Sequence, residues 1–312
     1  MNTSAAGATL SLQNPPVPPP RRLTVAYTTP SNYADRLLSR LILHLQKPNP
    51  PNLIWTPTVV VESTLGTTNS IKPLFTNSNL EEFSAIAFTS RTGITAISDI
   101  LKHQSQPLSS MGHTFTVSAL GIDTELLDSH FISKLCPGNP SRIEVLVPPV
   151  ATPTSLAESL GFGLGRKVMC PVPQLIGLTE PTVVPNFLQA LAARGWVPIR
   201  ASAYETRWAG PNCAAPLMQL GLQLDAIVFT STAEVEGLLK SLRELGFEWD
   251  MLRKRWPQLL VAAHGPITAA GANGLGLAVD VVGSKFGSFD GIAEALAIEL
   301  FRRNYYSKEL QW

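Results

Sequence analysis

The sequence has few charged residues and almost no excess of either sign. Charged residues make up 15% of the 312 residues, and 24 Lys and Arg against 23 Asp and Glu leave a formal net charge of +1. A chain this neutral produces no positive field that would hold nucleic acid or an anionic membrane surface. We therefore expect neither nucleic acid nor a membrane among the partners. With 45% hydrophobic residues, the composition indicates a compact protein of one large or two smaller domains.

The chain is also poor in cysteine. Cys136, Cys170 and Cys213 are far apart and form no CxxC pair and no cluster with histidine, so we predict buried, reduced thiols and no metal site. The longest stretch without Lys, Arg, Asp or Glu near the C-terminus, residues 256–279, is interrupted by two prolines and several glycines. That pattern is typical of strand, turn and helix, so no transmembrane helix is predicted.

Residues 1–22 differ from the rest of the chain. They are rich in Ser, Ala, Thr and Pro, contain no acidic residue and end in Pro-Pro-Pro-Arg-Arg. Acid-poor, hydroxyl-rich leaders are typical of organelle import signals, whereas a disordered Pro-rich tail is the alternative. The segment lacks the apolar run of a secretory signal. We predict a plastid location if the leader is a transit peptide and a cytoplasmic location otherwise.

From residue 23 onward, short apolar or β-branched runs alternate with segments of helical periodicity, which is the pattern of an α/β fold. Most of the runs lack polar alternation, as expected for parallel strands covered on both faces. The predicted strands are 23–27, 54–60, 85–89, 115–120, 143–147, 167–170, 197–204, 226–230, 259–263 and 279–282. The predicted helices include 34–46, 94–101, 125–135, 184–194, 235–245 and 292–302.

Two short motifs occur twice, in the same order. Phe-Thr-Ser occupies 88–90 and 229–231, and Gly-x-x-Thr occupies 121–124 and 265–268. Each copy follows a predicted strand, and the two motifs are separated by nearly the same distance in both halves. This repetition predicts two α/β domains of the same type.

The repeated motifs lie where ligands bind in open parallel sheets, beyond the carboxyl ends of the strands. Their hydroxyls can cap helices, and their glycines allow a ligand to approach the backbone closely. We call each point where a strand ends and the next helix begins a corner. Helix N-termini at such corners attract anions through unpaired N–H groups. A cleft between two domains of this kind would suit a ligand with several carboxylates, without requiring a basic protein.

These motifs, together with Tyr204-Glu205-Thr206 at the end of a predicted strand, resemble those of uroporphyrinogen-III synthase over about residues 23–300. The resemblance implies two similar three-layer α/β domains with parallel sheets, a two-strand connector and a cleft between the domains. The implied boundaries are a leader at 1–22, a first domain at 23–52 plus 208–312, a second domain at 62–196, and connectors at 53–61 and 197–207.

The resemblance also implies a reaction. Members of this family are lyases that close linear hydroxymethylbilane into uroporphyrinogen III, with loss of water and inversion of the last pyrrole ring. No cofactor or metal is expected. A monomer is expected, and the enzyme that makes the bilane is a candidate partner.

Site residues follow from the same resemblance. Tyr204 is expected to donate the proton that the departing hydroxyl needs, because a phenol stays protonated at neutral pH. Packing of its ring is the alternative role. The residues expected to bind substrate are Thr89, Ser90, Gly121, Thr124, Thr230, Ser231, Thr232, Gly265 and Thr268.

Some features depart from the family pattern. Pro171-Val172-Pro173 replaces a glycine-bearing loop and removes backbone donors there, while His264 is expected in the core. Arg91, Arg207 and Lys285 could pair with carboxylates or remain surface charges. Two other functions stay open: a non-catalytic relative that binds a tetrapyrrole or a protein partner in the same cleft, and a sugar or amino-acid binding protein, for which the secretory leader is missing.

Overall fold

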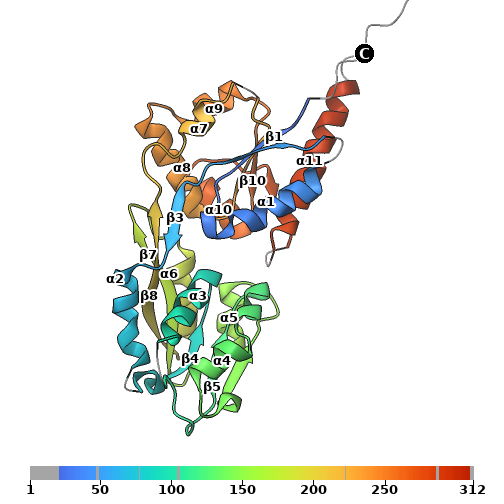
Figure 1. Cartoon of the computed structure of the whole chain (residues 1–312). Coiled ribbons are helices and arrows are strands. Elements are labelled where there is room, and N and C mark those ends of the chain that lie inside the picture. Colours follow the sequence, from blue (N-terminus) through green and yellow to red (C-terminus); the bar gives the residue numbers. More distant parts are fainter. Residues whose placement is uncertain are drawn as a thin grey trace, which may run out of the picture.

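The computed structural model describes residues 21–309 except 47–48, 77, 104–105, 222 and 286–287. Two sheets, each covered by helices on both faces, form two domains placed end to end (Figure 1). The predicted α/β class, with two similar three-layer domains of mostly parallel strands, is confirmed. Residues 1–20, and with them nearly all of the predicted leader, lie outside the described residues.

The first domain is built on a parallel sheet with the strand order β11-β10-β9-β1-β2. Its three central strands are buried along their whole length, which explains their mostly apolar sequences. Two helices, α1 and α11, cover one face and the other helices cover the opposite face. The elements are β1 Thr24–Tyr27, α1 Ser31–Leu45, β2 Asn52–Trp55, α7 Ala215–Met218, β9 Ala226–Phe229, α8 Thr232–Glu244, α9 Trp249–Arg255, β10 Leu260–Ala263, α10 Pro266–Gly274, β11 Val281–Val282 and α11 Asp290–Glu309.

The second domain contains a sheet with the order β3-β8-β7-β4-β5-β6, parallel except that edge strand β3 runs antiparallel to β8. Helices α2, α3 and α4 pack on one face and α5 and α6 on the other. The elements are β3 Val59–Glu62, α2 Leu65–Ile71, β4 Phe83–Ala87, α3 Arg91–Leu101, β5 Phe115–Ser118, α4 Ser129–Leu135, β6 Ile143–Leu146, α5 Pro153–Ser159, β7 Lys167–Ile176, α6 Val183–Ala193, β8 Val197–Trp208 and the short 3-10 helices Lys72–Phe75, Asn79–Glu82, Gly121–Leu126 and Pro140–Arg142.

Three predicted elements differ from the structure. The single strand predicted at 54–60 is two strands, β2 and β3, which belong to different sheets and are separated by Pro57. The strand predicted at 167–170 continues to Ile176, because its prolines pair along β8 instead of forming a loop. The helix predicted at 125–135 is divided into a 3-10 turn and α4.

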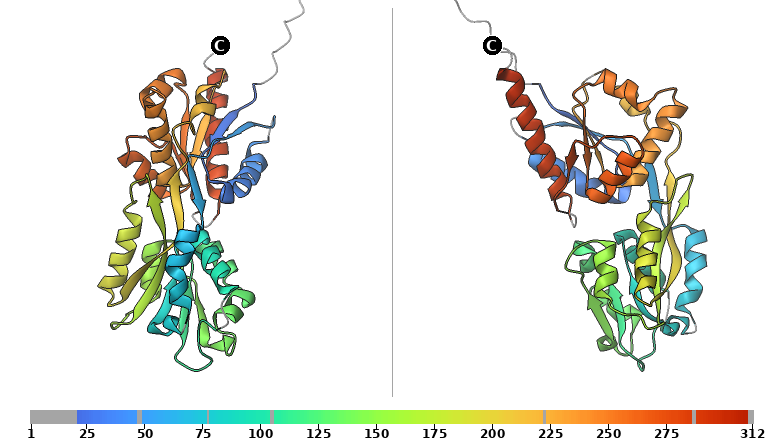
Figure 2. Two further views of the ribbon diagram at one scale, coloured as in Figure 1. Left: turned by 60° about the vertical axis from the view of Figure 1, so that its left-hand side comes forward. Right: turned by 180° about the vertical axis from the view of Figure 1, so that it is seen from behind.

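The connection between the domains rests on α8. Strands β7 and β8 extend beyond the body of the second domain toward the first (Figure 2), and Trp208 at the end of β8 donates its indole N–H to Gly237 O at 2.9 Å. Next to it, the Thr58 hydroxyl donates to Glu234 O at 2.7 Å, and the amide of Ala209 donates to Thr58 O at 3.0 Å. The chain passes between the domains twice, near Thr58 and near Trp208, and both of these crossings are thereby attached to α8.

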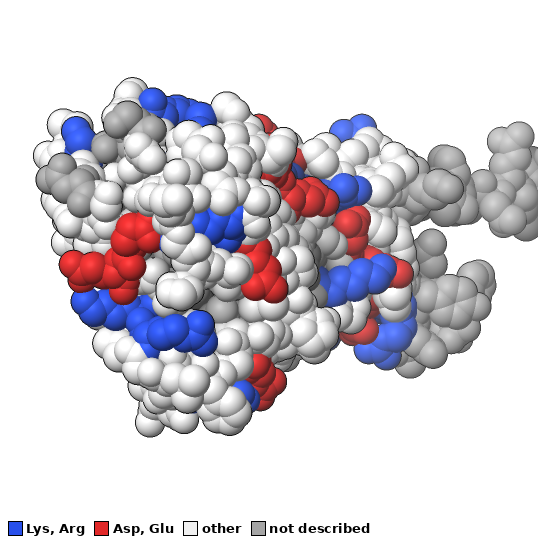
Figure 3. Space-filling view, turned by 90° about the horizontal axis from the view of Figure 1, so that it is seen from below, with Lys and Arg blue, Asp and Glu red and all other residues white. Residues whose placement is uncertain are grey.

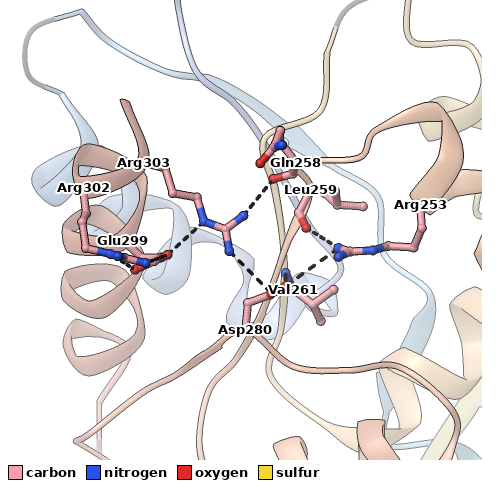
Figure 4. A network of polar contacts seen from close by, with 8 residues as sticks. All are labelled: Arg253, Gln258, Leu259, Val261, Asp280, Glu299, Arg302 and Arg303. Carbon is pink, nitrogen blue, oxygen red and sulfur yellow. Dashed lines mark hydrogen bonds and ion pairs between the residues drawn. The ribbon is translucent and has the colours of Figure 1, made fainter. Parts of the chain in front are cut away.

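The end of the first domain away from these crossings is held by a polar network (Figure 4). Arg303 on α11 contacts Glu299 at 2.9 Å and Asp280 at 3.6 Å, and Asp280 accepts the amide of Val261 at 2.8 Å. Hydrogen bonds from the Arg302 and Arg303 guanidinium groups lower the pKa of Glu299 to about 2. The network ties the last helix to the amino ends of β10 and β11.

Other surface features agree with the composition. No helix in the described part of the chain is long and apolar enough to cross a membrane. On the face of the second domain that points away from the first, Lys and Arg lie next to Asp and Glu (Figure 3). All three cysteines are free, but only Cys136 and Cys170 are buried; Cys213 is half-buried, which corrects the prediction for that residue.

Gly237 provides a test of this connection. A Cβ at Gly237 would lie 2.5 Å from Thr58 O, so Gly237→Ala should push α8 away from the crossing and lower the free energy of unfolding by about 2 kcal/mol. In the control Gly274→Ala, the Cβ meets nothing within 4 Å, and a gain of about 0.5 kcal/mol is expected. Urea unfolding of both variants measures the difference; equal stabilities would refute the tight contact.

Candidate functional site

A cleft of about 450 Å³ lies between the two domains, and both contribute to its walls. Its volume falls in the range of small-molecule sites. The structure brings most of the predicted site residues together in the lining: Thr89, Ser90, Tyr204, Thr230, Ser231, Thr232, Gly265 and Thr268. It does not place Gly121 or Thr124 there; Leu120 and Asp123 line the cleft instead.

Tyr204 reaches the cleft because of an irregularity in its strand. Between the pairs Val172↔Ser202 and Pro173↔Tyr204, β8 has one residue more than β7, which is a β-bulge. A bulge shifts the alternation of side chains along a strand, and Ala201, Ala203 and Tyr204 all pack on the same face of the sheet. The bulge therefore turns the phenol toward α3 and the cleft.

The phenol of Tyr204 is held by the first Phe-Thr-Ser motif. Ser90 caps α3 by accepting the amide of Gly93 at 3.2 Å, and its Oγ is hydrogen-bonded to the Tyr204 hydroxyl at 2.8 Å. Tyr204 is only 5% exposed, and burial raises the pKa of its phenol well above its ordinary value. The group stays protonated at any physiological pH, as an acid must before it donates.

The floor and one wall of the cleft are apolar. The floor consists of the extended ends of β3, β8 and β7, with Val59, Val61 and Leu175 among its side chains. Val184 and Phe187 of α6 form part of the wall. Val172 and Pro173 also line the cleft, so the proline-containing segment contributes an apolar surface there.

Seven helices begin at the cleft. Its lining contains the first residues of α1, α3, α5, α6, α8, α10 and α11, or the residues just before them. Figure 1 shows α1 and α10 on one side of the gap and α3 and α6 on the other. Unpaired N–H groups and aligned dipoles make each such end attractive to anions. The cleft thus favours negative charge although Arg36 is the only Lys or Arg in its described lining.

Glu234 is the main residue that the sequence analysis missed. It lines the cleft but is only 1% exposed. Its carboxyl accepts from the Thr28 hydroxyl at 2.8 Å, from the Thr230 amide at 2.9 Å and from the Ser231 hydroxyl at 3.1 Å, and the Thr230 hydroxyl also contacts it. The Ser-x-x-Glu spacing from Ser231 is a capping-box signal that could have identified it.

The remaining predicted residues have other local contacts. Thr268 donates to Thr230 O at 3.1 Å, while Thr124 donates to Ala119 O at 3.3 Å. Gly121 takes a positive φ of 52° at the start of its 3-10 helix, a conformation that favours glycine. Its role in the structure is therefore the turn.

Two of the candidate cations lie outside the cleft, whereas His264 lines it. Arg207 pairs with Glu62 at 2.7 Å and Lys285 with Glu294 at 2.9 Å; neither of these cations is in the lining. The expectation of a core histidine is corrected, because His264 is half-buried and lines the cleft with its ring against Phe289.

The domains also touch within the cleft lining, where the hydroxyl of Tyr33 of α1 is hydrogen-bonded to Thr92 Oγ1 of α3 at 2.9 Å. No group of three or more His, Cys, Asp or Glu that could hold a metal ion occurs among the residues described.

Comparison with known proteins now identifies the family. A family model for uroporphyrinogen-III synthase HemD matches residues 58–293. The chain belongs to the uroporphyrinogen-III synthase family. The synthase from the thermophilic bacterium Thermus thermophilus, in a mutant form, has a similar structure with a TM-score of 0.52, 16% sequence identity and coverage of 91% of this chain and 99% of that one. Uroporphyrinogen-III synthetase from Helicobacter pylori aligns at 15% identity over 90% of this chain and 100% of its own, with a TM-score of 0.47. Comparison with curated protein sequences finds no match.

At 16% identity, the likeness to the Thermus thermophilus structure shows the shared fold. The resemblance stated from the sequence motifs is confirmed at the level of the family and the fold. The roles of individual cleft residues rest on the geometry described above.

The buried carboxyl of this family member gives a prediction. Glu234→Ala leaves several buried donors unpaired and should cost about 3 kcal/mol of stability. Glu234→Gln keeps an acceptor for the Thr230 amide, while its NH₂ can donate to the rotatable hydroxyls of Thr230 and Ser231, so it should cost about 1 kcal/mol or less.

The difference in stability between wild type and Glu234→Gln should depend on pH. Burial raises the pKa of Glu234 above its ordinary 4.5, so the folded state binds this proton more tightly than the unfolded chain. Stability from this group is complete below pH 4.5 and falls as pH rises through the folded pKa. The Glu234→Gln variant has no such proton and should therefore gain on wild type as the pH rises. Unfolding curves across this range would contradict the assignment if the difference stayed constant.

Proposed function

We propose that the protein is a uroporphyrinogen-III synthase that closes hydroxymethylbilane with loss of water and inversion of the terminal pyrrole ring. The observation that carries the proposal is the buried, neutral phenol of Tyr204, which lies 2.8 Å from the Ser90 hydroxyl in the lining of the interdomain cleft. Family membership supplies the reaction class, and the cleft supplies an acid and an anion-attracting environment.

The chemistry needs little beyond that acid. An electron-rich pyrrole pushes its nitrogen electron pair toward the hydroxymethyl carbon, and the C–O bond breaks as Tyr204 protonates the oxygen. Water leaves, and the Ser90 hydroxyl can donate to the phenolate that forms. For inversion, the new C–C bond must form at the α-carbon of the terminal pyrrole that already carries a bridge. The old bridge bond then breaks and re-forms at the unsubstituted α-carbon, and the proton lost from that carbon balances the one delivered. Holding both ends of the chain in one enclosed geometry supplies much of the rate.

The carboxylate side chains of the substrate would bind at the helix N-termini. Thr232 and Gly265 lie at two of these ends, and Thr89 and Ser90 lie at a third. The apolar floor and the α6 wall would then face the pyrrole rings. A bilane has both kinds of surface, which matches the two kinds of wall.

One observation favours a second candidate, a relative that binds a tetrapyrrole without cyclising it. Arg36 is the only Lys or Arg lining the cleft within the described residues, whereas a bilane has many carboxylates. On this reading, the apolar floor would bind the ring system of a finished tetrapyrrole. The two candidates differ in whether the protein changes the product of ring closure.

The isomer of the product decides between them. Hydroxymethylbilane closes spontaneously to the type I isomer, so purified protein should direct the product to the type III isomer. The products, oxidised to porphyrins and separated by chromatography, give the ratio directly. An unchanged isomer ratio with saturable porphyrin binding would instead support the non-catalytic relative.

Tyr204→Phe tests the acid. Loss of the phenolic proton should lower kcat about 10²-fold, with little change in KM, because the ring still fills its site. Tyr27→Phe is the matched control, since Tyr27 is equally buried but lies in β1 outside the cleft lining. Turnover by Tyr204→Phe equal to that of the control would remove Tyr204 from the chemistry.

A further inference from the structure

Asp123 lines the cleft where the Gly-x-x-Thr motif predicted Thr124. The segment Gly121–Leu126 forms a 3-10 helix, so Thr124 turns back to Ala119 O and Asp123 lines the cleft. Asp123 is the third residue of its Gly-x-x-Thr motif. The third residue of the corresponding motif in the first domain is Ile267, which also lines the cleft. The two motifs thus contribute different side chains to the cleft lining, a carboxyl from the second domain and an apolar side chain from the first.

The contacts of Asp123 differ from those of a structural ion pair. Arg91 Nη1 lies 3.4 Å from Asp123 Oδ1, and both side chains keep part of their surface exposed. Elsewhere in the second domain, Arg142 contacts both oxygens of Glu81, at 2.8 and 2.6 Å, which is the bidentate geometry of a tight pair. Arg91 is outside the cleft lining and Asp123 is within it, so this single long contact leaves the carboxyl accessible from the cleft.

The surroundings keep this carboxyl compatible with an anionic ligand. Burial raises the pKa of Asp123, and the positive charges of Arg91 and of Arg36 on α1 oppose this rise. Arg36 lines the cleft and stacks over the Phe289 ring at 5.5 Å. Two guanidinium groups for one carboxylate leave a local excess of positive charge. A ligand with carboxylates and N–H donors on the same unit would satisfy both signs.

We propose that Asp123 is a substrate-contacting catalytic carboxylate that accepts pyrrole N–H groups of the bilane and stabilises the positive charge that forms when water leaves. This inference rests on the function proposed above. When the C–O bond breaks, the pyrrole nitrogen provides the electron pair and the ring becomes an azafulvenium cation, whose N–H is more acidic and binds a carboxylate more strongly. The interaction therefore grows from ground state to transition state, as a catalytic interaction must. Asp123 takes up no proton, and the attacked pyrrole releases its proton after ring closure.

Asp123→Asn keeps the shape and removes the charge. Type III product formation should fall about 10²-fold in kcat, with KM within about threefold of wild type. Asp123→Glu, which restores the charge on a longer side chain, should recover at least a tenth of the wild-type kcat. The matched control is Asp99→Asn on α3, an exposed carboxylate paired with Lys102 at 2.6 Å, which should turn over like wild type.

Wild-type kcat in Asp123→Asn would overturn this inference, as would equal losses in the Asn and Glu variants. Loss of the folded circular dichroism spectrum in Asp123→Asn would also overturn it, because the carboxyl would then be a structural partner of Arg91. These failures differ from failure of the proposed function, in which wild-type protein itself leaves the isomer ratio unchanged.

Discussion

The cleft depends on one directional constraint: both sheets point the carboxyl ends of their parallel strands toward the same gap. In the first domain these ends precede the segments that begin α1, α8, α10 and α11, and in the second domain they precede the segments that begin α3, α5 and α6. Because a right-handed crossover returns each helix antiparallel to its strand, the N-terminus of the next helix follows the carboxyl end of a strand. The anion-attracting character of the cleft is thus a consequence of topology and needs few basic side chains.

This constraint explains why the sequence analysis located much of the site. Strand ends and helix starts are local features, so Thr89, Ser90, Thr230 and Ser231 could be assigned to corners from their motifs alone. The repeat then placed both corners at equivalent positions of two domains. The cleft lining contains all four residues.

What the sequence could not provide depends on contacts between distant segments. The bulge that turns Tyr204 toward the cleft arises from the pairing of β8 with β7, and a register of this kind depends on the partner strand as well as on the residue itself. Asp123 lines the cleft in place of Thr124 because residues 121–126 form a 3-10 helix where the start of an α-helix was expected. The division of the predicted connector strand is different, because Pro57 between β2 and β3 is a local signal that could have indicated the break.

The two Phe-Thr-Ser corners, alike in sequence, differ in the third residue of the helix that follows. In α3 this residue is Gly93, whose amide binds Ser90 and leaves the serine hydroxyl free to act on Tyr204. In α8 it is Glu234, whose carboxyl already binds the hydroxyls of Thr230 and Ser231. A hydroxyl that donates to a buried carboxyl cannot donate the same proton to a ligand. The second-domain corner is therefore suited to the reacting end of a ligand. The first-domain corner is suited to holding the connecting segment at Thr58 and to binding a ligand through the backbone amides at the start of α8.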